Sequence, residues 1–346
     1  MLETIIHQLE QKQDLNASQI PEIINSLVNE NISPQIKAAF LTALAQKGET
    51  VEEISAFTRE LRERSIRPEL PPEISQSTFL DIVGTGGDRL NTFNISTASA
   101  IIVAAAGVYI AKHGNRAITS QCGSADVLNA LGIPTDIPAK DAGAFLLKHH
   151  FVFLFAPLYH PAFKHLAPAR KICAEKGQRT LFNFLGPLLN PMRPSAQMVG
   201  TSRPDLCEPL ARVLQALGVR HASVVCGRVG DACMDEFSIL GANKMASFIE
   251  NGPIAVSENA YPDYLVPNAN LEQLKGGSPQ ENAEIIIQLL QAKDKGPRRH
   301  IVLLNAGAAL ITCGRAATMT EAQALAAELI DSGKAFEHLK SITKGC

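Results

Sequence analysis

Residues 81–88 read Asp-Ile-Val-Gly-Thr-Gly-Gly-Asp, and the apolar run that begins at Phe79 leads into them. Three glycines within four residues let the backbone turn sharply and bring successive N–H groups close to a ligand. A helix-like segment follows at 94–100 and adds its positive N-terminal end. This order of strand, glycine turn and helix predicts an α/β fold with a phosphate-binding loop.

The glycine turn differs from both common nucleotide-binding motifs. It lacks the lysine and the spacing of a P-loop, and residues 84–87 do not continue to the third glycine of a dinucleotide fingerprint. A turn of this kind can also serve close packing alone. However, polar side chains crowd it, and helix capping needs only one or two of them. They are Asp88, Asn91, Asn94, Ser96 and Thr97.

Short β-branched runs alternate with alanine-rich helical stretches beyond the glycine turn. Such alternation predicts a mostly parallel central sheet covered by helices. The fold class is therefore α/β, with this larger unit expected over residues 73–346. The expected strands are 79–83, 108–112, 151–154, 196–199, 222–225 and 245–248.

The segment 1–70 is expected to form a small N-terminal helical domain. Ser33 precedes a proline at a first helical position, and Thr50 with Glu53 forms a capping box for the next helix. The proline-rich stretch 67–72 cannot continue a helix and is predicted to be a linker. A helical unit this small leaves apolar faces uncovered, so it should dock on the rest of the chain or on a second subunit.

The composition limits the possible partners. The chain has 346 residues, of which 46% are hydrophobic and 19% charged, with a formal net charge of −2. No broad positive field therefore favours nucleic acid or an anionic membrane, and local groups must hold any anionic substrate. Seven scattered cysteines without a Cys-x-x-Cys pair favour reduced thiols over disulfides or a zinc site. Because there is no signal-peptide pattern and no apolar run of about 18 residues, we expect a cytoplasmic protein.

A second polar loop, Lys112-His113-Gly114-Asn115-Arg116, follows the apolar run at 107–111. It therefore lies at the carboxyl end of a predicted strand, the sheet edge at which open α/β folds bind ligands. A further hydroxyl- and glycine-rich turn at 119–128 opens another helix. Two such turns in succession can hold a ligand with two separate phosphate clusters.

Three side chains of the second loop admit more than one role. His113 titrates near neutral pH and can carry a proton, although a histidine beside glycine as often packs or bonds to the backbone. Arg116 is expected to brace the fold through a carboxylate rather than to contact substrate. Asn115 can both donate and accept hydrogen bonds in an exposed turn, which favours a ligand contact.

Adjacent carboxylates at Asp235 and Glu236 have apolar neighbours on both sides. Two like charges on a semi-buried turn are costly unless a cation offsets them. Mg²⁺ suits oxygen ligands of this type and completes its coordination with water and substrate phosphates. A solvated acidic loop is the alternative interpretation, and the two upstream loops favour the metal site.

Taken together, these motifs resemble those of the anthranilate phosphoribosyltransferase family. The resemblance implies a nucleoside phosphorylase/phosphoribosyltransferase-like fold in which helices within about 160–185 complete the helical domain. It also implies a homodimer formed through the N-terminal helices. The matching segments are 84–88, 94–97, 112–116, 123–126 and 235–236, with further matches at 155–157, 160–161, 180–191 and 330–335 that extend over nearly the whole chain.

The same resemblance implies a Mg²⁺-dependent transfer of the 5-phosphoribosyl group from 5-phosphoribosyl-1-pyrophosphate (PRPP) to anthranilate. Lys112 is then expected to stabilise the leaving pyrophosphate. Because an aromatic amine is already neutral at neutral pH, no side chain is expected to act as an essential base. The resemblance assigns magnesium to Ser96, Asp235 and Glu236, and anthranilate to Gly84, Asn115 and Arg170. It assigns PRPP to Gly84, Thr85, Gly86, Gly87, Asp88, Thr92, Asn94, Ile95, Ser96, Thr97, Lys112, His113, Gly114, Asn115 and Ser124.

Departures from the family pattern leave some details open. The segment 170–179 is a few residues longer than usual, so Arg179 competes with Arg170 for the anthranilate carboxylate. The segment 227–235 is also longer than usual. Ala117 and Thr119 stand where serines are frequent, which puts one hydroxyl contact in doubt.

Two other functions remain open from the sequence. A pyrimidine-nucleoside phosphorylase shares the general fold and also acts at ribose C1, but the paired carboxylates and the second polar loop favour the transferase. A nucleic-acid-binding relative would need a basic groove, whereas the chain has 34 acidic against 32 basic residues.

Overall fold

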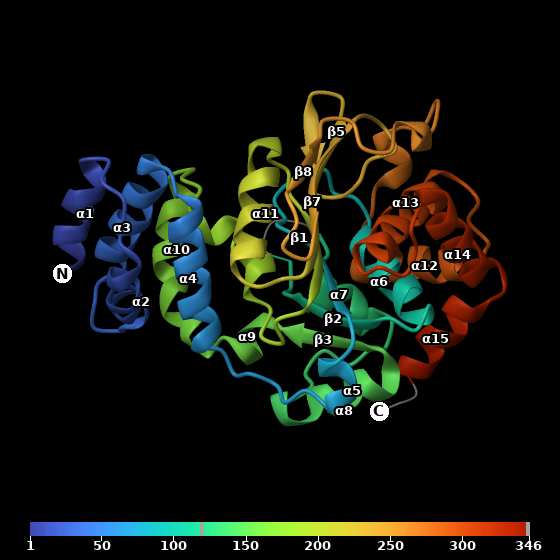
Figure 1. Ribbon diagram of the computed structural model, residues 1–346, viewed down its shortest axis with the longest axis horizontal. Coiled ribbons are helices and arrows are strands. Elements are labelled where there is room, and N and C mark those ends of the chain that lie inside the picture. The colour runs from blue at the N-terminus through green and yellow to red at the C-terminus, as the bar shows by residue number, and fades with distance from the viewer. Residues whose placement is uncertain (118–120, 344–346) are drawn as a thin grey trace.

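An N-terminal helical bundle lies beside a larger α/β unit in the computed structural model, which describes residues 1–117 and 121–343 (Figure 1). The Ser33 hydroxyl accepts a hydrogen bond from the Ile36 N–H at 3.3 Å, so the predicted cap is confirmed. A late helix, α10 (Ala167–Glu175), packs against α3 and adds to the buried cluster of the bundle. The N-terminal helices are α1 (Leu2–Glu10), α2 (Ile20–Val28), α3 (Pro34–Lys47) and α4 (Val51–Glu63).

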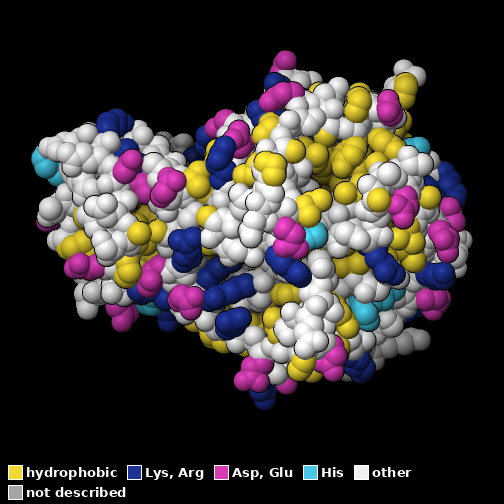
Figure 2. Space-filling model, in the orientation of Figure 1, with side chains coloured by type: hydrophobic (Ala, Val, Ile, Leu, Met, Phe, Trp, Pro, Cys, Tyr) yellow, Lys and Arg dark blue, Asp and Glu magenta, His cyan; other side chains and the backbone are white. Residues whose placement is uncertain are grey.

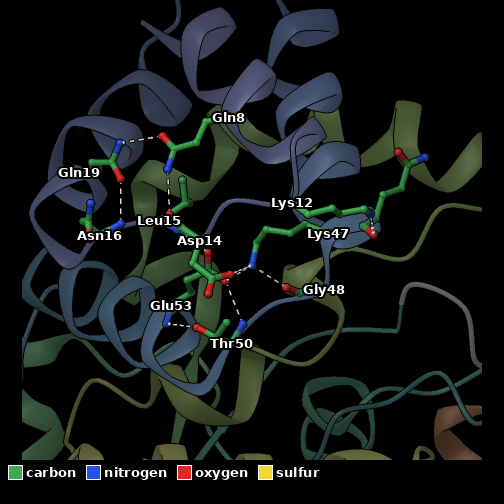
Figure 3. Close-up of polar contacts among 11 residues, drawn as sticks. Gln8, Lys12, Asp14, Leu15, Asn16, Gln19, Lys47, Gly48, Thr50 and Glu53 are labelled. Carbon is green, nitrogen blue, oxygen red and sulfur yellow. Dashed lines mark hydrogen bonds and ion pairs between the residues drawn. The ribbon is translucent and has the colours of Figure 1, made fainter.

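Glu53 connects three segments of the bundle (Figure 3). It completes the predicted capping box, because Thr50 accepts from the Glu53 N–H at 3.1 Å and the Glu53 carboxylate accepts from the Thr50 N–H at 2.9 Å. The same carboxylate accepts from the Leu15 N–H and from Lys47 Nζ, both at 2.8 Å. Since Glu53 is only 1% exposed, these partners offset the cost of burying its charge. They also fix the loop after α1 against the start of α4.

The chain crosses from the bundle to the α/β unit through residues 65–71, which lie outside helices and strands. The linker predicted at 67–72 therefore ends one residue earlier than expected. Pro72 takes the first position of a short helix, α5 (Pro72–Ser75), where the missing N–H of proline costs the helix nothing.

A mixed sheet with the strand order β3-β2-β1-β4-β5-β7-β8 forms the centre of the α/β unit. Its first five strands run parallel, whereas β6 (Ala232–Met234), β7 and β8 (Ala255–Ser257) pair antiparallel. The carboxyl ends of β1, β2 and β4 therefore meet at one edge. The six strands predicted from the sequence are β1 (Phe79–Gly84), β2 (Tyr109–Gly114), β3 (Phe151–Phe155), β4 (Ala196–Gly200), β5 (His221–Val229) and β7 (Asn243–Ile249).

Helices cover both faces of the sheet (Figure 1). On one face lie α6 (Ile95–Ala105) and α13 (Pro297–Thr312), and on the other lies α11 (Cys207–Ala216). Successive residues of β5 point to opposite faces of the sheet. Val225 packs in the hydrophobic cluster with α6 and α13, whereas Val224 packs in the cluster with α11. Helix α11 also contacts α4, so the bundle core continues onto the sheet. The other helices are α7 (Ser124–Ala130), α8 (Ala139–His149), α9 (Ala156–Tyr159), α12 (Pro279–Leu290), α14 (Met319–Asp331) and α15 (Lys334–Thr343).

In the two described ranges, none of the helices is both long and apolar enough to cross a bilayer.

Candidate active site

A cavity of about 580 Å³ opens at the carboxyl edge of β1, β2 and β4 and extends to the bundle. Every residue that the sequence assigned to PRPP, magnesium or anthranilate lines it, with the exception of Thr97. Thr97 is fully buried in α6, because successive residues of a helix point about 100° apart and its neighbour Ser96 faces the cavity. The structure therefore does not bring the Thr97 side chain to the predicted PRPP contact.

Three glycines at neighbouring strand ends let the segment 235–238 cross the sheet edge at close range. A Cβ atom on Gly84 would lie 2.1 Å from Asp235 Oδ2, and one on Gly200 would lie 1.5 Å from the Asp235 carbonyl oxygen. A Cβ atom on Gly227 would lie 2.5 Å from the carbonyl oxygen of the next residue along that segment. Since Gly84 and Gly200 are partners in the register of β1 and β4, together they make the space for Asp235.

Asp235 and Glu236 lie against the glycine loop and the start of α6. The Asp235 carboxylate accepts from the Gly86 N–H at 2.6 Å, and the Glu236 carboxylate accepts from the Ser96 N–H at 3.1 Å. Burial, and then the charge of Asp88, raise the pKa of Asp235 to about 7. Burial, and then the charge of Asp235, raise the pKa of Glu236 to about 8. Three carboxylates thus share a site with too little positive charge to balance them.

The glycine loop keeps some N–H groups for a ligand. Those of Gly86 and Ser96 donate to carboxylates, and that of Thr85 donates to a β4 carbonyl at 2.9 Å, so these three N–H groups already have acceptors within the protein. As far as the chain is described, the N–H groups of residues 87–89 have no hydrogen-bond acceptor. Positive φ angles of 74° and 78° at the second and third glycines form the turn that exposes them.

Lys112 projects from β2 toward the same carboxylates. Its side chain is only 2% exposed, and Nζ donates to the Ile82 carbonyl at 2.5 Å and to the Ser96 hydroxyl at 3.2 Å. Burial lowers the pKa of Lys112, while the charges of Asp81 and of the 235–236 pair oppose that shift. The amine is therefore fixed where β1, α6 and the carboxylates meet, within reach of an anionic ligand in the cavity.

His113 points to the opposite face of β2 and is held as a neutral ring. Its Nδ1 lies 3.2 Å from the Gly186 carbonyl oxygen, and the ring meets His160 edge to face at a centroid distance of 5.3 Å. Burial, and then the charge of His160, lower the pKa of His113 to about 3. Of the two interpretations, the geometry favours packing over proton transfer near neutral pH.

Two arginines reach the cavity from the segment 170–179. Arg170 on α10 is half-buried, with its guanidinium over the Phe182 ring at 5.7 Å from the centroid. Burial lowers the pKa of Arg170, but a guanidinium keeps its charge at neutral pH. Arg179 is exposed, and its Nη2 donates to the Gly87 carbonyl at 3.3 Å. Arg170 thus lies beside an aromatic ring, whereas Arg179 reaches the glycine loop.

Known protein families account for almost the whole chain. A family profile described as "Glycosyl transferase family, a/b domain" matches residues 76–336, and one described as "Glycosyl transferase family, helical bundle domain" matches residues 3–65. The anthranilate phosphoribosyltransferase of Symbiobacterium thermophilum is 44% identical over 345 residues, which is 99% of this chain and 98% of that protein. This chain belongs to the anthranilate phosphoribosyltransferase family. It is therefore a glycosyltransferase of tryptophan biosynthesis.

Solved anthranilate phosphoribosyltransferases share this fold. The enzyme from Thermus thermophilus superposes with a TM-score of 0.85 at 37% identity, over 98% of each chain. The enzyme from Saccharomyces cerevisiae, in complex with PRPP and Mg, superposes with a TM-score of 0.85 at 27% identity, over 100% of this chain and 98% of that one. The yeast enzyme in complex with 4-fluoroanthranilate superposes with a TM-score of 0.82 at 25% identity, over 99% of this chain and 97% of that one. The predicted fold class is confirmed.

The two segments that the sequence indicated to be longer than the family pattern consist largely of regular structure. The segment 227–235 is the hairpin of β5 and β6, in which Arg228 pairs with Cys233. The segment 170–179 completes α10 and then returns to the cavity. Thr119, which stands where a serine is frequent, lies outside the described residues.

The contact that Arg116 makes differs from the one expected from the sequence. We expected it to brace the fold through a carboxylate, but its guanidinium lies over the Phe155 ring, 5.7 Å from the centroid. No ion pair of Arg116 is found in the described part of the chain. The aromatic partner comes from the end of β3, which is the neighbour of β2 in the sheet. Phe155 is far from Arg116 in the sequence, so the local sequence around Arg116 could not predict this contact.

Some residues that line the cavity were not predicted from the sequence. Glu49 lines the cavity from the bundle, and Arg203 lines it from the loop after β4. Phe182 supplies the aromatic surface beneath Arg170. Gly200, which makes space for Asp235 beside the cavity, carried a usable signal, because it follows an expected strand as Gly84 does.

Proposed function

We propose that this enzyme transfers the 5-phosphoribosyl group of PRPP to the amine of anthranilate, giving N-(5-phosphoribosyl)anthranilate and pyrophosphate. One observation carries the proposal: the glycine loop, Lys112 and the 235–236 carboxylates share a single cavity with Arg170 and Phe182. The first group suits a sugar pyrophosphate with its cation. The second suits an aromatic acid. The cavity therefore has residues suited to bind each of the two substrates.

The glycine loop and Lys112 are suited to stabilising the departure of pyrophosphate. Negative charge grows on the pyrophosphate oxygens as the bond from ribose C1 to oxygen breaks. The N–H groups of residues 87–89 and the Lys112 amine can donate to those oxygens from positions already fixed by the fold. Because Lys112 is buried, its charge acts with little screening by water.

The 235–236 carboxylates and the Ser96 hydroxyl fit a magnesium ion. They are hard oxygen donors, and the raised pKa values of both carboxyl groups indicate a place that gains from positive charge. In residues 1–117 and 121–343, no three His, Cys, Asp or Glu side chains are arranged to hold a metal alone. That agrees with an ion that takes its remaining ligands from water and substrate phosphates. When bound, Mg²⁺ supplies positive charge to the leaving pyrophosphate.

Arg170 and Asn115 are suited to orienting anthranilate. A guanidinium binds a carboxylate through two parallel hydrogen bonds, and Phe182 offers an apolar surface beside it. Alignment of two reactants contributes ~7–11 kcal/mol in favourable cases, whereas a general base adds roughly 10²–10⁴-fold. The aromatic amine needs no deprotonation before it attacks, which fits the buried neutral ring of His113.

We expect His113→Asn to lose less than roughly 100-fold in kcat, the lower limit for removal of a general base. Asparagine keeps an N–H for the Gly186 carbonyl but cannot titrate. Since the pKa of His113 is lowered to about 3, the pH profile of kcat should be the same for both proteins in the neutral range. A larger loss with both substrates still bound, or a lost inflection in the profile, would restore His113 as an acid–base group.

The fluorescence of phosphoribosylanthranilate tests the proposed reaction directly. Product should form from PRPP and anthranilate only when Mg²⁺ is present, and thymidine with phosphate should give no thymine. Thymine release without the fluorescent product would make the protein a pyrimidine-nucleoside phosphorylase. Salt-dependent DNA binding without turnover would make it a nucleic-acid-binding relative. The homodimer through the N-terminal helices and the cytoplasmic location remain predictions.

A further inference from the structure

A second cavity, of about 390 Å³, lies at the amino edge of the sheet, opposite the candidate active site. The starts of β1, β4 and β5, the end of α4 and the linker after α4 bound it. As far as the structure describes the chain, it shares no lining residue with the active-site cavity. Figure 2 shows Lys and Arg side chains gathered in the region where Figure 1 places the end of α4 and the linker.

Among the described residues, arginines supply all the charged side chains that line this second cavity. Arg62 is only 5% exposed, and its Nε donates to the Leu188 carbonyl at 2.6 Å. Its buried Nη2 has no hydrogen-bond acceptor among the described residues. Buried guanidinium nitrogens are normally paired, so an acceptor is missing here. The four arginines are Arg62, Arg67, Arg193 and Arg220.

Nearby carboxylates offset only part of this positive charge. Arg193 Nη2 lies 2.8 Å from Glu63, whose side chain is 67% exposed, and Arg220 Nη1 lies 4.0 Å from Glu250. Neither carboxylate lines the cavity. Arg67 is exposed and has no ion pair in the described part of the chain. The lining of the cavity therefore carries more positive than negative charge.

We propose that the second cavity binds a phosphate-class dianion, either inorganic phosphate or the phosphate group of a small metabolite. Guanidinium groups present paired N–H donors that match phosphate oxygens, and several of them around one anion are typical of phosphate recognition. A dianion balances the excess charge better than a single carboxylate does. Because Arg67 lies in the linker and Arg220 immediately precedes β5, the bound anion connects the linker to the sheet.

Equilibrium dialysis of orthophosphate against the full-length protein tests this site. EDTA in the buffer suppresses magnesium-dependent binding in the active-site cavity. Arg67→Gln with Arg220→Gln removes two guanidinium groups that are not buried, so the fold should survive. Arg212→Gln, an exposed arginine of α11 outside the cavity, is the matched control.

We expect the double variant to bind orthophosphate at least roughly tenfold more weakly than the unmodified protein and the control. The kcat and the KM for PRPP should be unchanged in all three, since these arginines lie outside the active-site cavity. Equal phosphate binding by the three proteins would overturn the proposal, with unchanged melting temperatures showing that the fold is intact.

Competing ligands identify the source of the anion. Unlabelled glycerol 3-phosphate and unlabelled orthophosphate are compared as competitors of bound, labelled orthophosphate. If glycerol 3-phosphate displaces it at the lower concentration, the natural ligand is a phosphorylated metabolite. If orthophosphate does so, the ligand is inorganic phosphate. Malonate carries two negative charges on carboxylates instead. If malonate binds more tightly than both phosphates, the assignment to the phosphate class is wrong.

Discussion

The double variant Asp235→Asn with Glu236→Gln should lose roughly 100- to 1,000-fold in kcat/KM for PRPP and remain folded. Both substitutions keep the size of the side chain, so the close fit of Asp235 against Gly84 and Gly200 is retained. They remove the two negative charges that suit a divalent cation. Steady-state rates measured over a magnesium titration should also show a higher Mg²⁺ concentration at half-maximal activity.

The same double variant should be more stable than the unmodified protein in the absence of magnesium at pH 8. Folding raises the pKa of Asp235 to about 7 and that of Glu236 to about 8, so the folded protein keeps protons that the unfolded chain has lost. Its stability therefore falls as the pH rises from about 4, the ordinary carboxyl range, to about 8. The variant cannot titrate there and avoids this loss.

Thermal melting at pH 5 and pH 8 measures the effect. An effect of 1 kcal/mol corresponds to a change in Tm on the order of 2 °C for a chain of this size. The advantage of the variant should grow from pH 5 to pH 8, and added Mg²⁺ should stabilise only the unmodified protein. The exposed Asp231 in the turn of the same hairpin gives a matched control, Asp231→Asn. Unchanged magnesium dependence of activity in the double variant would remove Asp235 and Glu236 from the metal role.

The sequence predicts the parts of this enzyme that depend on a few adjacent residues. The glycine turn at 84–87 lies where its local pattern placed it, after β1, and both it and Lys112 line the cavity. The predicted end of the next strand was two residues short, since β2 continues through Lys112 to Gly114. The helix caps predicted at Ser33 and Thr50 are likewise formed, because each depends only on residues within one helical turn.

The remaining parts of the site depend on contacts between distant segments. Arg116 lies over Phe155 and Arg179 reaches Gly87 only because the strand order and α10 bring those segments together. Thr97 shows a limit of a different kind. Its residue type suits a phosphate cradle, but the rotation of α6 turns it into the core, and that rotation is set by packing against α13.

Arg170→Gln should raise the KM for anthranilate by roughly 10- to 150-fold and leave the KM for PRPP nearly unchanged. The range is the loss expected when one charge-assisted contact is removed. Arg170 is half-buried, and its guanidinium lies beside the Phe182 ring. Its attraction for the anthranilate carboxylate is therefore screened less by water than at an exposed site. Initial rates measured against each substrate in turn separate the two constants, and a melting curve confirms the fold.

Arg179→Gln provides the opposing measurement, because the two arginines compete for the same role. Arg179 donates to the Gly87 carbonyl, and this contact with the glycine loop predicts a larger effect on PRPP than on anthranilate. An aromatic acid needs a guanidinium and a ring surface together. Of these two arginines, only Arg170 has a ring contact within the described ranges. If Arg179→Gln raised the KM for anthranilate while Arg170→Gln changed only that for PRPP, the two assignments would have to be exchanged.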